Sequence, residues 1–125
     1  MNSQTPATAS LTVGDEDTAI AVGSGDVAVL ATPCLVAVCE QATVVAVTDM
    51  LGSGETSVGI RVDIEHLAAS AVGATVIATA EIRSVDGNSV TCGVEAHEGS
   101  KLVGRGTVVR LRVERDRFMS RLGTS

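Results

Sequence analysis

The feature that most constrains the fold of this chain is a regular alternation of apolar and polar residues over positions 56–114, interrupted by short turn-forming segments. Such a period of two is typical of strands that bury one face, because successive side chains point to opposite sides of a sheet. The clearest run sets one face, Val58, Ile60, Val62, Ile64 and His66, against another, Arg61, Asp63 and Glu65. We therefore predict a meander of four antiparallel strands with one apolar and one largely polar face.

The same alternation assigns directions to the two histidines. His66 lies on the apolar face of its run and is expected to point toward the core. Residues 86–88, Asp-Gly-Asn, predict a hairpin turn between the runs at 74–85 and 90–96. His97 follows on the polar face of the second of these runs, so we expect it to point outward.

The last strand, near residues 107–113, is less regular. Gly104-Arg105-Gly106 interrupts the alternation, and a β-bulge would explain the break. Beyond it, one face is formed by Thr107, Val109, Leu111 and Val113, and the other by Val108, Arg110, Arg112 and Glu114. Because the first set is the more apolar, we expect Arg110 on the outward face.

Residues 32–50 are the apolar segment available to cover the sheet. Thr32 before Pro33 is typical of a helix N-cap followed by the first helical position, and the Gly-Ser-Gly at residues 52–54 ends the run. The segment is long enough to span a bilayer, but Glu40 near its middle would cost about 2.5–3.5 kcal/mol to insert. We predict a buried helix of a soluble protein, preceded by a first strand at residues 9–13 or 18–22.

Composition excludes several classes of protein. The net charge is −6 and Phe118 is the one aromatic residue, so binding to nucleic acid is not expected. Three cysteines without a Cys-x-x-Cys pair suggest neither disulfides nor a zinc site, which fits a reducing cytoplasm. Residues 1–10 lack the features of a signal peptide. We expect a flexible tail there, one domain at residues 11–115 and a second tail at residues 116–125, with no cofactor.

Two side chains are candidates for chemistry on these grounds alone. Glu40 lies in an otherwise apolar helix, and His66 ends the strand face that this helix should cover. A buried carboxylate has a raised pKa and an imidazole can share its proton, so the pair suits acid/base chemistry, although a structural pair or a surface Glu40 is the alternative. Thr32 adds a hydroxyl, but a cap explains it equally well. Eight residues of helix rise roughly 12 Å, so Thr32 and Glu40 of one chain meet one substrate only if it bridges them or two subunits contribute.

Several short motifs resemble one known family. They are Ala31-Thr32-Pro33 with Glu40 eight positions after the threonine, Val58-Gly59 followed by His66-Leu67-Ala68-Ala69, residues 80–87 (AEIRSVDG) and Ala96-His97-Glu98-Gly99. In order and spacing they are similar to the fluoroacetyl-CoA thioesterase-like branch of the hot-dog superfamily. The resemblance implies an α+β hot-dog fold, in which a curved antiparallel sheet of about five strands wraps one long central helix, and a homodimer with its site at or near the interface.

The resemblance also implies an activity and a set of residues. It implies hydrolysis of an acyl-coenzyme A thioester by Thr32, Glu40 and His66, with substrate bound near Gly59 and Arg110. On this basis we expect Glu40 to attack the thioester or to activate water, and His66 and Thr32 to stabilise and protonate the departing groups. The fluoroacetyl-specific enzyme has lid phenylalanines that residues 19–30 here lack, so we expect a different acyl group. A non-catalytic acyl-CoA-binding module and an enoyl-CoA hydratase on the same fold are the alternatives.

Overall fold

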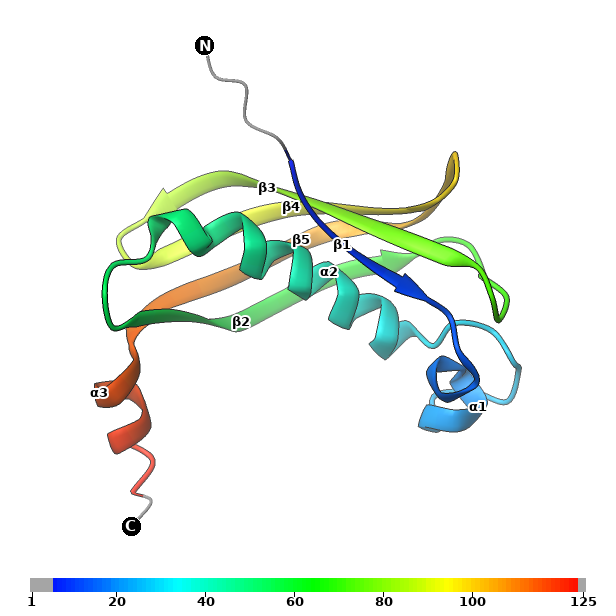
Figure 1. Ribbon diagram of the computed structural model, residues 1–125, viewed down its shortest axis with the longest axis horizontal. Helices are drawn as coiled ribbons and strands as arrows, with labels where there is room; N and C mark the ends of the chain where they lie inside the picture. Colours follow the sequence, from blue (N-terminus) through cyan, green and yellow to red (C-terminus); the bar gives the residue numbers. More distant parts are fainter. Residues whose placement is uncertain (1–5, 124–125) are drawn as a thin grey trace.

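A sheet of five antiparallel strands curls around one long helix (Figure 1). The computed structural model describes residues 6–123. The strands are β1 (Ala7–Thr12), β2 (Glu55–His66), β3 (Thr75–Asp86), β4 (Ser89–Glu98) and β5 (Lys101–Glu114). The helices are α1 (Ala19–Val22), α2 (Thr32–Val47) and α3 (Arg115–Ser120), with short 3-10 turns at Asp15–Asp17 and Thr48–Met50.

The strand order is β1-β3-β4-β5-β2, and this corrects the predicted four-strand meander. Strands β3, β4 and β5 do form consecutive hairpins, with the first turn at Gly87, whose φ of 63° suits the two-residue loop. Strand β2, however, pairs with β5 and not with β3, whose other edge is occupied by β1. Alternation reports which face a side chain takes, but it does not report which strand lies beside it.

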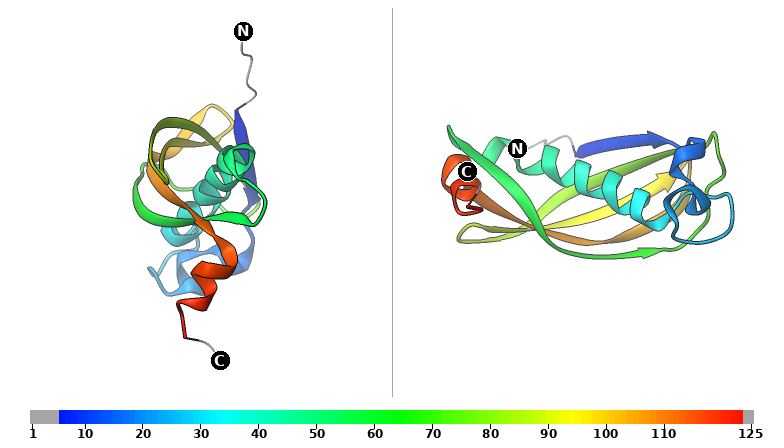
Figure 2. Two further views of the ribbon diagram at one scale, coloured as in Figure 1. Left: turned by 90° about the vertical axis from the view of Figure 1, so that its left-hand side faces the viewer. Right: turned by 90° about the horizontal axis from the view of Figure 1, so that it is seen from below.

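Helix α2 lies in the concave side of the sheet, as the views from the end and from below show (Figure 2). Its buried side chains recur every three or four residues: Leu35, Val38, Cys39, Ala42, Thr43 and Val47. They pack against a core that is wholly aliphatic apart from cysteine, in agreement with the low aromatic content. The predicted helix is thus confirmed. Within the described residues, the helix at Thr32–Met50 is also long and apolar enough to cross a membrane by length and composition alone.

The two ends of the chain differ from prediction. Strand β1 begins at Ala7, so the expected N-terminal tail at residues 1–10 is too long; residues 1–5 lie outside the described range. Of the two candidate first strands, the segment near residue 9 is correct, whereas Ala19–Val22 is the helix α1. At the other end α3 continues directly from β5, so part of the expected tail at residues 116–125 is helical.

Bulges in two strands move side chains to the face opposite the predicted one. In β2 the register shifts between Gly59 and Arg61, so Ile60 bulges outward and is 54% exposed, while Gly59 faces α2. In β5 the extra residue is Val103, one position before the predicted bulge. Beyond this bulge the even-numbered residues face α2, so Arg110 points inward and is only 6% exposed. The expectation of an outward Arg110, which relied on the odd-numbered set being the more apolar, is wrong. The direction of His66 is confirmed.

Candidate active site

Thr32 and His66 form the first of two polar groups along α2. Thr32 is the first residue of α2 and His66 the last residue of β2, and their Oγ1 and Nδ1 atoms are 2.7 Å apart. The other ring nitrogen of His66, Nε2, is buried and has no hydrogen-bond partner among the described residues. Burial lowers the pKa of His66, an effect that the backbone of Ala68 partly offsets. The ring is therefore mostly neutral near pH 7, with one nitrogen on Thr32 and one unpaired.

The Thr32 hydroxyl is not used as a helix cap. The N-cap of α2 is Ala31, which makes no side-chain capping bond, and Thr32 already has helical geometry with Pro33 behind it. The predicted N-cap role is therefore wrong by one residue. Because an N1 hydroxyl is not needed by the helix backbone, Thr32 is free to bond His66.

A glycine opposite His66 allows the strand end to approach the helix. Gly104 of β5 pairs with His66 in the β2–β5 ladder. A Cβ atom at this position would lie 2.8 Å from Cδ2 of Leu35 in α2 and 2.9 Å from the carbonyl oxygen of Glu65. Such distances are well inside van der Waals contact, so a side chain here would displace Leu35 of α2 and the β2 backbone next to His66.

Glu40 belongs to a second polar group, further along α2. Its Oε2 atom is 3.7 Å from Nη1 of Arg110, whose side chain is 8% exposed, while that of Glu40 is 36% exposed. Glu40 is therefore not the buried, isolated carboxylate that the sequence suggests. It is one half of an ion pair whose cation is buried and whose anion reaches the surface of the single chain.

Arg110 is held by neighbours on two elements. Its Nε donates to Oγ of Ser57 at 2.9 Å and its Nη2 to the Ser57 carbonyl at 3.2 Å, both in β2. Its Nη1 donates to Oγ1 of Thr43 in α2 at 3.5 Å. With the Glu40 contact, the guanidinium thus bridges the strand and the helix.

Gly59 completes this second group. It is opposite Arg110 in the β2–β5 ladder, and a Cβ atom built on it would lie 2.5 Å from Oε2 of Glu40 and 3.5 Å from Nη1 of Arg110. Only a residue without a side chain leaves the carboxylate where it is. The absent side chain also leaves the backbone here open to close approach by a ligand.

The two groups are separate within one chain. The first contains Thr32 and His66, the second Glu40, Gly59 and Arg110, and the helix between Thr32 and Glu40 rises roughly 12 Å. No hydrogen bond or ion pair links the groups among the described residues. The expected pairing of Glu40 with His66 is therefore not made within a single chain.

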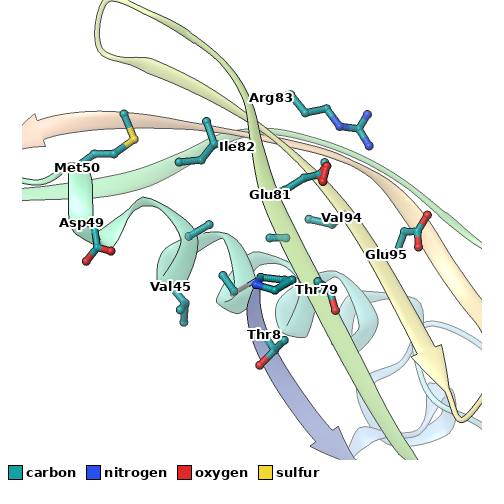
Figure 3. A pocket seen from close by; sticks show the side chains of 15 residues that line it. Thr8, Val45, Asp49, Met50, Thr79, Glu81, Ile82, Arg83, Val94 and Glu95 are labelled. Carbon is teal, nitrogen blue, oxygen red and sulfur yellow. The ribbon is translucent and has the colours of Figure 1, made fainter. Parts of the chain in front are cut away.

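An open hollow of about 1070 Å³ lies elsewhere, between the start of β1, the C-terminal end of α2 and the middle of β3 and β4. Figure 3 shows Val45, Met50 and Ile82 around it, with Glu81 and Arg83 near its rim. None of the candidate residues lines this hollow. It therefore does not bring the two polar groups to one substrate.

The cysteines do not supply a nucleophile. All three are free, and burial raises the pKa of each thiol, that of Cys39 to about 11. The thiolate is the reactive form, and none of the three populates it near neutral pH. Among the described residues, no cluster of three or more histidine, cysteine or carboxylate side chains could hold a metal ion.

Two residues of this site were missed in the sequence. Ser57 lies two positions before Gly59, on the same face of β2, and Thr43 lies one turn after Glu40 on α2. Both spacings were visible. However, their meaning depends on Arg110 pointing inward, which the sequence did not indicate.

Solved structures place this architecture among the hot-dog-fold thioesterases. A thioesterase-superfamily member from Thermus thermophilus superimposes with a TM-score of 0.87 at 26% identity, covering 94% of this chain and 88% of the other. The profile of the fluoroacetyl-CoA-specific thioesterase family matches residues 13–116. The chain belongs to this family.

Individual relatives agree. A fluoroacetyl-CoA thioesterase from Streptantibioticus cattleyicolor is 37% identical over 94 residues, which is 75% of this chain and 68% of the relative. A solved structure of a fluoroacetyl-CoA thioesterase has a TM-score of 0.87 at 30% identity, covering 98% of this chain and 95% of the other. The hot-dog fold and the acyl-CoA thioesterase class expected from the sequence are confirmed.

Proposed function

We propose that this protein is a homodimeric acyl-CoA thioesterase in which each site joins Thr32 and His66 of one subunit to Glu40 and Gly59 of the other. The observation that carries the proposal is the position of the two groups at different levels of the same edge strand, β2. A single chain contains both groups but does not bring them together. Pairing of two chains about a two-fold axis at β2 would bring the first group of one chain next to the second group of the other.

Strand β2 has the properties of an interface strand. It is twelve residues long, lies at an edge of the sheet and exposes Ile60 (54%) and Val62 (39%). A long, apolar edge presents unpaired backbone donors and acceptors, and soluble proteins rarely leave one uncovered. Pairing with a second copy of β2 would satisfy these groups.

Charge complementarity favours one register for that pairing. With the two-fold axis beside Val62, antiparallel partners are positions whose numbers sum to 124, so Arg61 faces Asp63 of the partner subunit and Asp63 faces its Arg61. The same register puts His66 of the partner subunit opposite Val58, next to Gly59. The Thr32–His66 group of one subunit then approaches the group of the other subunit that contains Glu40, Gly59 and Arg110.

The chemistry divides between these groups. Glu40 either attacks the thioester carbonyl carbon or takes a proton from a water that does so, and in both routes the carbonyl π electrons move to oxygen. Collapse of the tetrahedral intermediate breaks the carbon–sulfur bond and releases the coenzyme A thiolate. In the water route, the proton that Glu40 took from water passes through the Thr32–His66 pair to this thiolate. In the direct route, water then hydrolyses the acyl-glutamate anhydride, which restores Glu40 and supplies the proton that the thiolate receives through the same pair. The open backbone at Gly59 lets the carbonyl oxygen approach closely. Arg110 as a further substrate-binding residue remains a prediction.

The acyl group is proposed to differ from fluoroacetyl. The segment at residues 19–30, which contains α1, has no aromatic side chain and presents Ile20 (56% exposed) and Val27 (55% exposed). Aliphatic side chains cannot make the stacking contacts that phenylalanines make. We therefore expect turnover of several short acyl-CoA thioesters.

Wild type and Glu40→Gln, assayed with a thiol-trapping dye across short acyl-CoA substrates, test the function. Glu81→Gln, an exposed position of β3 away from the β2 edge, is the matched control. We expect coenzyme A release by wild type and Glu81→Gln, and a loss of about 10³-fold in kcat for Glu40→Gln. Wild-type turnover by Glu40→Gln would overturn the assignment. Binding without thiol release would favour a binding module, and enoyl-CoA conversion without free coenzyme A would favour a hydratase.

We also propose a cytoplasmic protein that binds neither nucleic acid nor membrane. Support comes from the free cysteines, the net charge of −6 and the location of α2 against the sheet, where its buried face is already covered. Fractionation of cells that produce the protein should recover it with soluble enzymes, and recovery in the membrane pellet would contradict the proposal.

A further inference from the structure

We infer that Ser57 and Thr43 are positioning residues for the reaction, because they fix the guanidinium of Arg110, which fixes the carboxylate of Glu40 against Gly59. The inference rests on the proposed function, in which Glu40 is the reacting carboxylate. It gives a role to the two polar side chains that hydrogen-bond Arg110, one from β2 and one from α2.

Ser57 holds Arg110 from the strand side. Its hydroxyl accepts from Nε at 2.9 Å and its carbonyl from Nη2 at 3.2 Å, so two donors on one edge of the planar guanidinium are bound to one residue. Two bonds on one edge of a planar group fix its orientation as well as its position. The remaining nitrogen, Nη1, is thereby turned toward α2.

Thr43 holds the same nitrogen from the helix side. Its side chain is fully buried, and its hydroxyl donates to the carbonyl oxygen of Glu40 at 2.6 Å, which leaves the hydroxyl oxygen free to accept from Nη1 of Arg110 at 3.5 Å. Thr43 thus ties the guanidinium to the helical turn that carries Glu40. Strand and helix are joined at the level of the reacting group.

The carboxylate has little other restraint. Glu40 is 36% exposed, and its Oε2 atom lies between Nη1 of Arg110 at 3.7 Å and the space left by the missing side chain of Gly59. A partly exposed glutamate that lost a fixed Arg110 would sample other rotamers. Because a displacement of about 1 Å in a reacting group can cost about 10²-fold in rate, the anchors of Arg110 matter for catalysis.

Ser57→Ala and Thr43→Val remove the hydroxyls, and Ser57→Thr and Thr43→Ser restore them. Ser84→Ala, on the exposed half of β3, is the control for loss of a serine. We expect kcat to fall about tenfold in Ser57→Ala and severalfold in Thr43→Val, with KM within about twofold of wild type, and to recover in the hydroxyl-bearing variants. The Arg110 Nε–H resonance should exchange faster with solvent in Ser57→Ala than in wild type.

Glu40→Gln, measured in parallel, separates the two ways to fail. If Glu40→Gln is inactive while Ser57→Ala and Thr43→Val keep wild-type kcat, the positioning inference is overturned and the proposed function stands. If Glu40→Gln retains activity, the proposed function fails and the inference fails with it. Equal losses in Ser57→Ala and Ser57→Thr would show that bulk and not the hydroxyl matters, which also overturns it. Should a variant unfold, the exchange rate of Arg110 Nε–H in Ser57→Thr decides: slow exchange supports the inference, and fast exchange contradicts it.

Discussion

The two polar groups along α2 differ in almost every physical respect. Thr32 and His66 form a neutral pair joined by one short hydrogen bond, whereas Glu40 and Arg110 form an ion pair in which a buried cation is held by two elements. In the neutral pair, Nε2 of His66 has no hydrogen-bond partner among residues 6–123, so the pair can give or take a proton. The ion pair keeps a negative charge in a fixed place. A hydrolase needs both abilities at one thioester, and the fold of one chain keeps them apart.

The largest expected effect comes from removing the proton-transferring member of the neutral pair. In His66→Ala we expect kcat to fall about 10³-fold, because the imidazole that contacts Thr32 and passes a proton to the leaving thiolate is lost. His97→Ala is the matched control, since His97 lies on the outer face beside Glu95 and should leave kcat unchanged. Steady-state kinetics with one short acyl-CoA measures both variants. Equal activity of the two would remove the neutral pair from the mechanism.

A smaller loss is expected when the ion pair is displaced but not removed. A Cβ atom in Gly59→Ala would lie 2.5 Å from Oε2 of Glu40, so the carboxylate must move and kcat should fall about 10²-fold. Gly52→Ala is the control, because its Cβ would have ordinary contacts, the nearest at 3.5 Å. Thermal unfolding should show that both variants fold. An unchanged kcat in Gly59→Ala would mean that the position of Glu40 does not matter.

The hydroxyl of the neutral pair is expected to contribute less. Thr32→Val keeps the shape of the side chain but removes the partner of His66 Nδ1, so kcat should fall about tenfold while Thr32→Ser stays near wild type. Because Ala31 and not Thr32 is the N-cap, the melting temperature should hardly change. A large drop in that temperature for Thr32→Val would restore the capping role and weaken the catalytic one.

The smallest expected effect is on stability and concerns His66 again. Burial lowers its pKa below the ordinary value of 6.5 in the folded chain. At pH values between the pKa of His66 in the folded chain and 6.5, the unfolded chain binds more protons than the folded chain. The free energy of unfolding therefore falls as the pH drops through this window, and it is fully restored above 6.5. Urea unfolding at pH values above and below the window should show a steeper loss in wild type and His97→Ala than in His66→Ala. An equal dependence of the unfolding free energy on pH in all three proteins would contradict a buried, neutral His66.

Local periodicity predicted much of this architecture. The central helix, the hairpin at Gly87 and the inward direction of His66 follow from patterns within single segments, and all three are confirmed. Each of these features depends only on residues that are close in the sequence. The strand that pairs with β2 does not follow from local sequence, and the predicted meander was wrong at that point.

The second polar group was not visible in the sequence for two different reasons. In β2 the extra residue, Ile60, is not a glycine and gives no local signal, and it turns Gly59 toward α2. In β5 a bulge was expected one position from Val103, but the less apolar of the two alternating sets, which contains Arg110, is the one that faces α2. With Arg110 expected to face outward, Ser57 and Thr43 had no visible partner.

The central claim, that the two groups act together across a two-fold axis, is tested most directly by mixing two inactive variants. Glu40→Gln and His66→Ala, unfolded and refolded together, form mixed dimers in which one of the two shared sites contains both wild-type residues. Random pairing should then restore about a quarter of wild-type activity, since half of the dimers are mixed and each has one intact site. If both residues of a site come from the same subunit, no mixed dimer contains an intact site, and a mixture as inactive as its components would contradict the account.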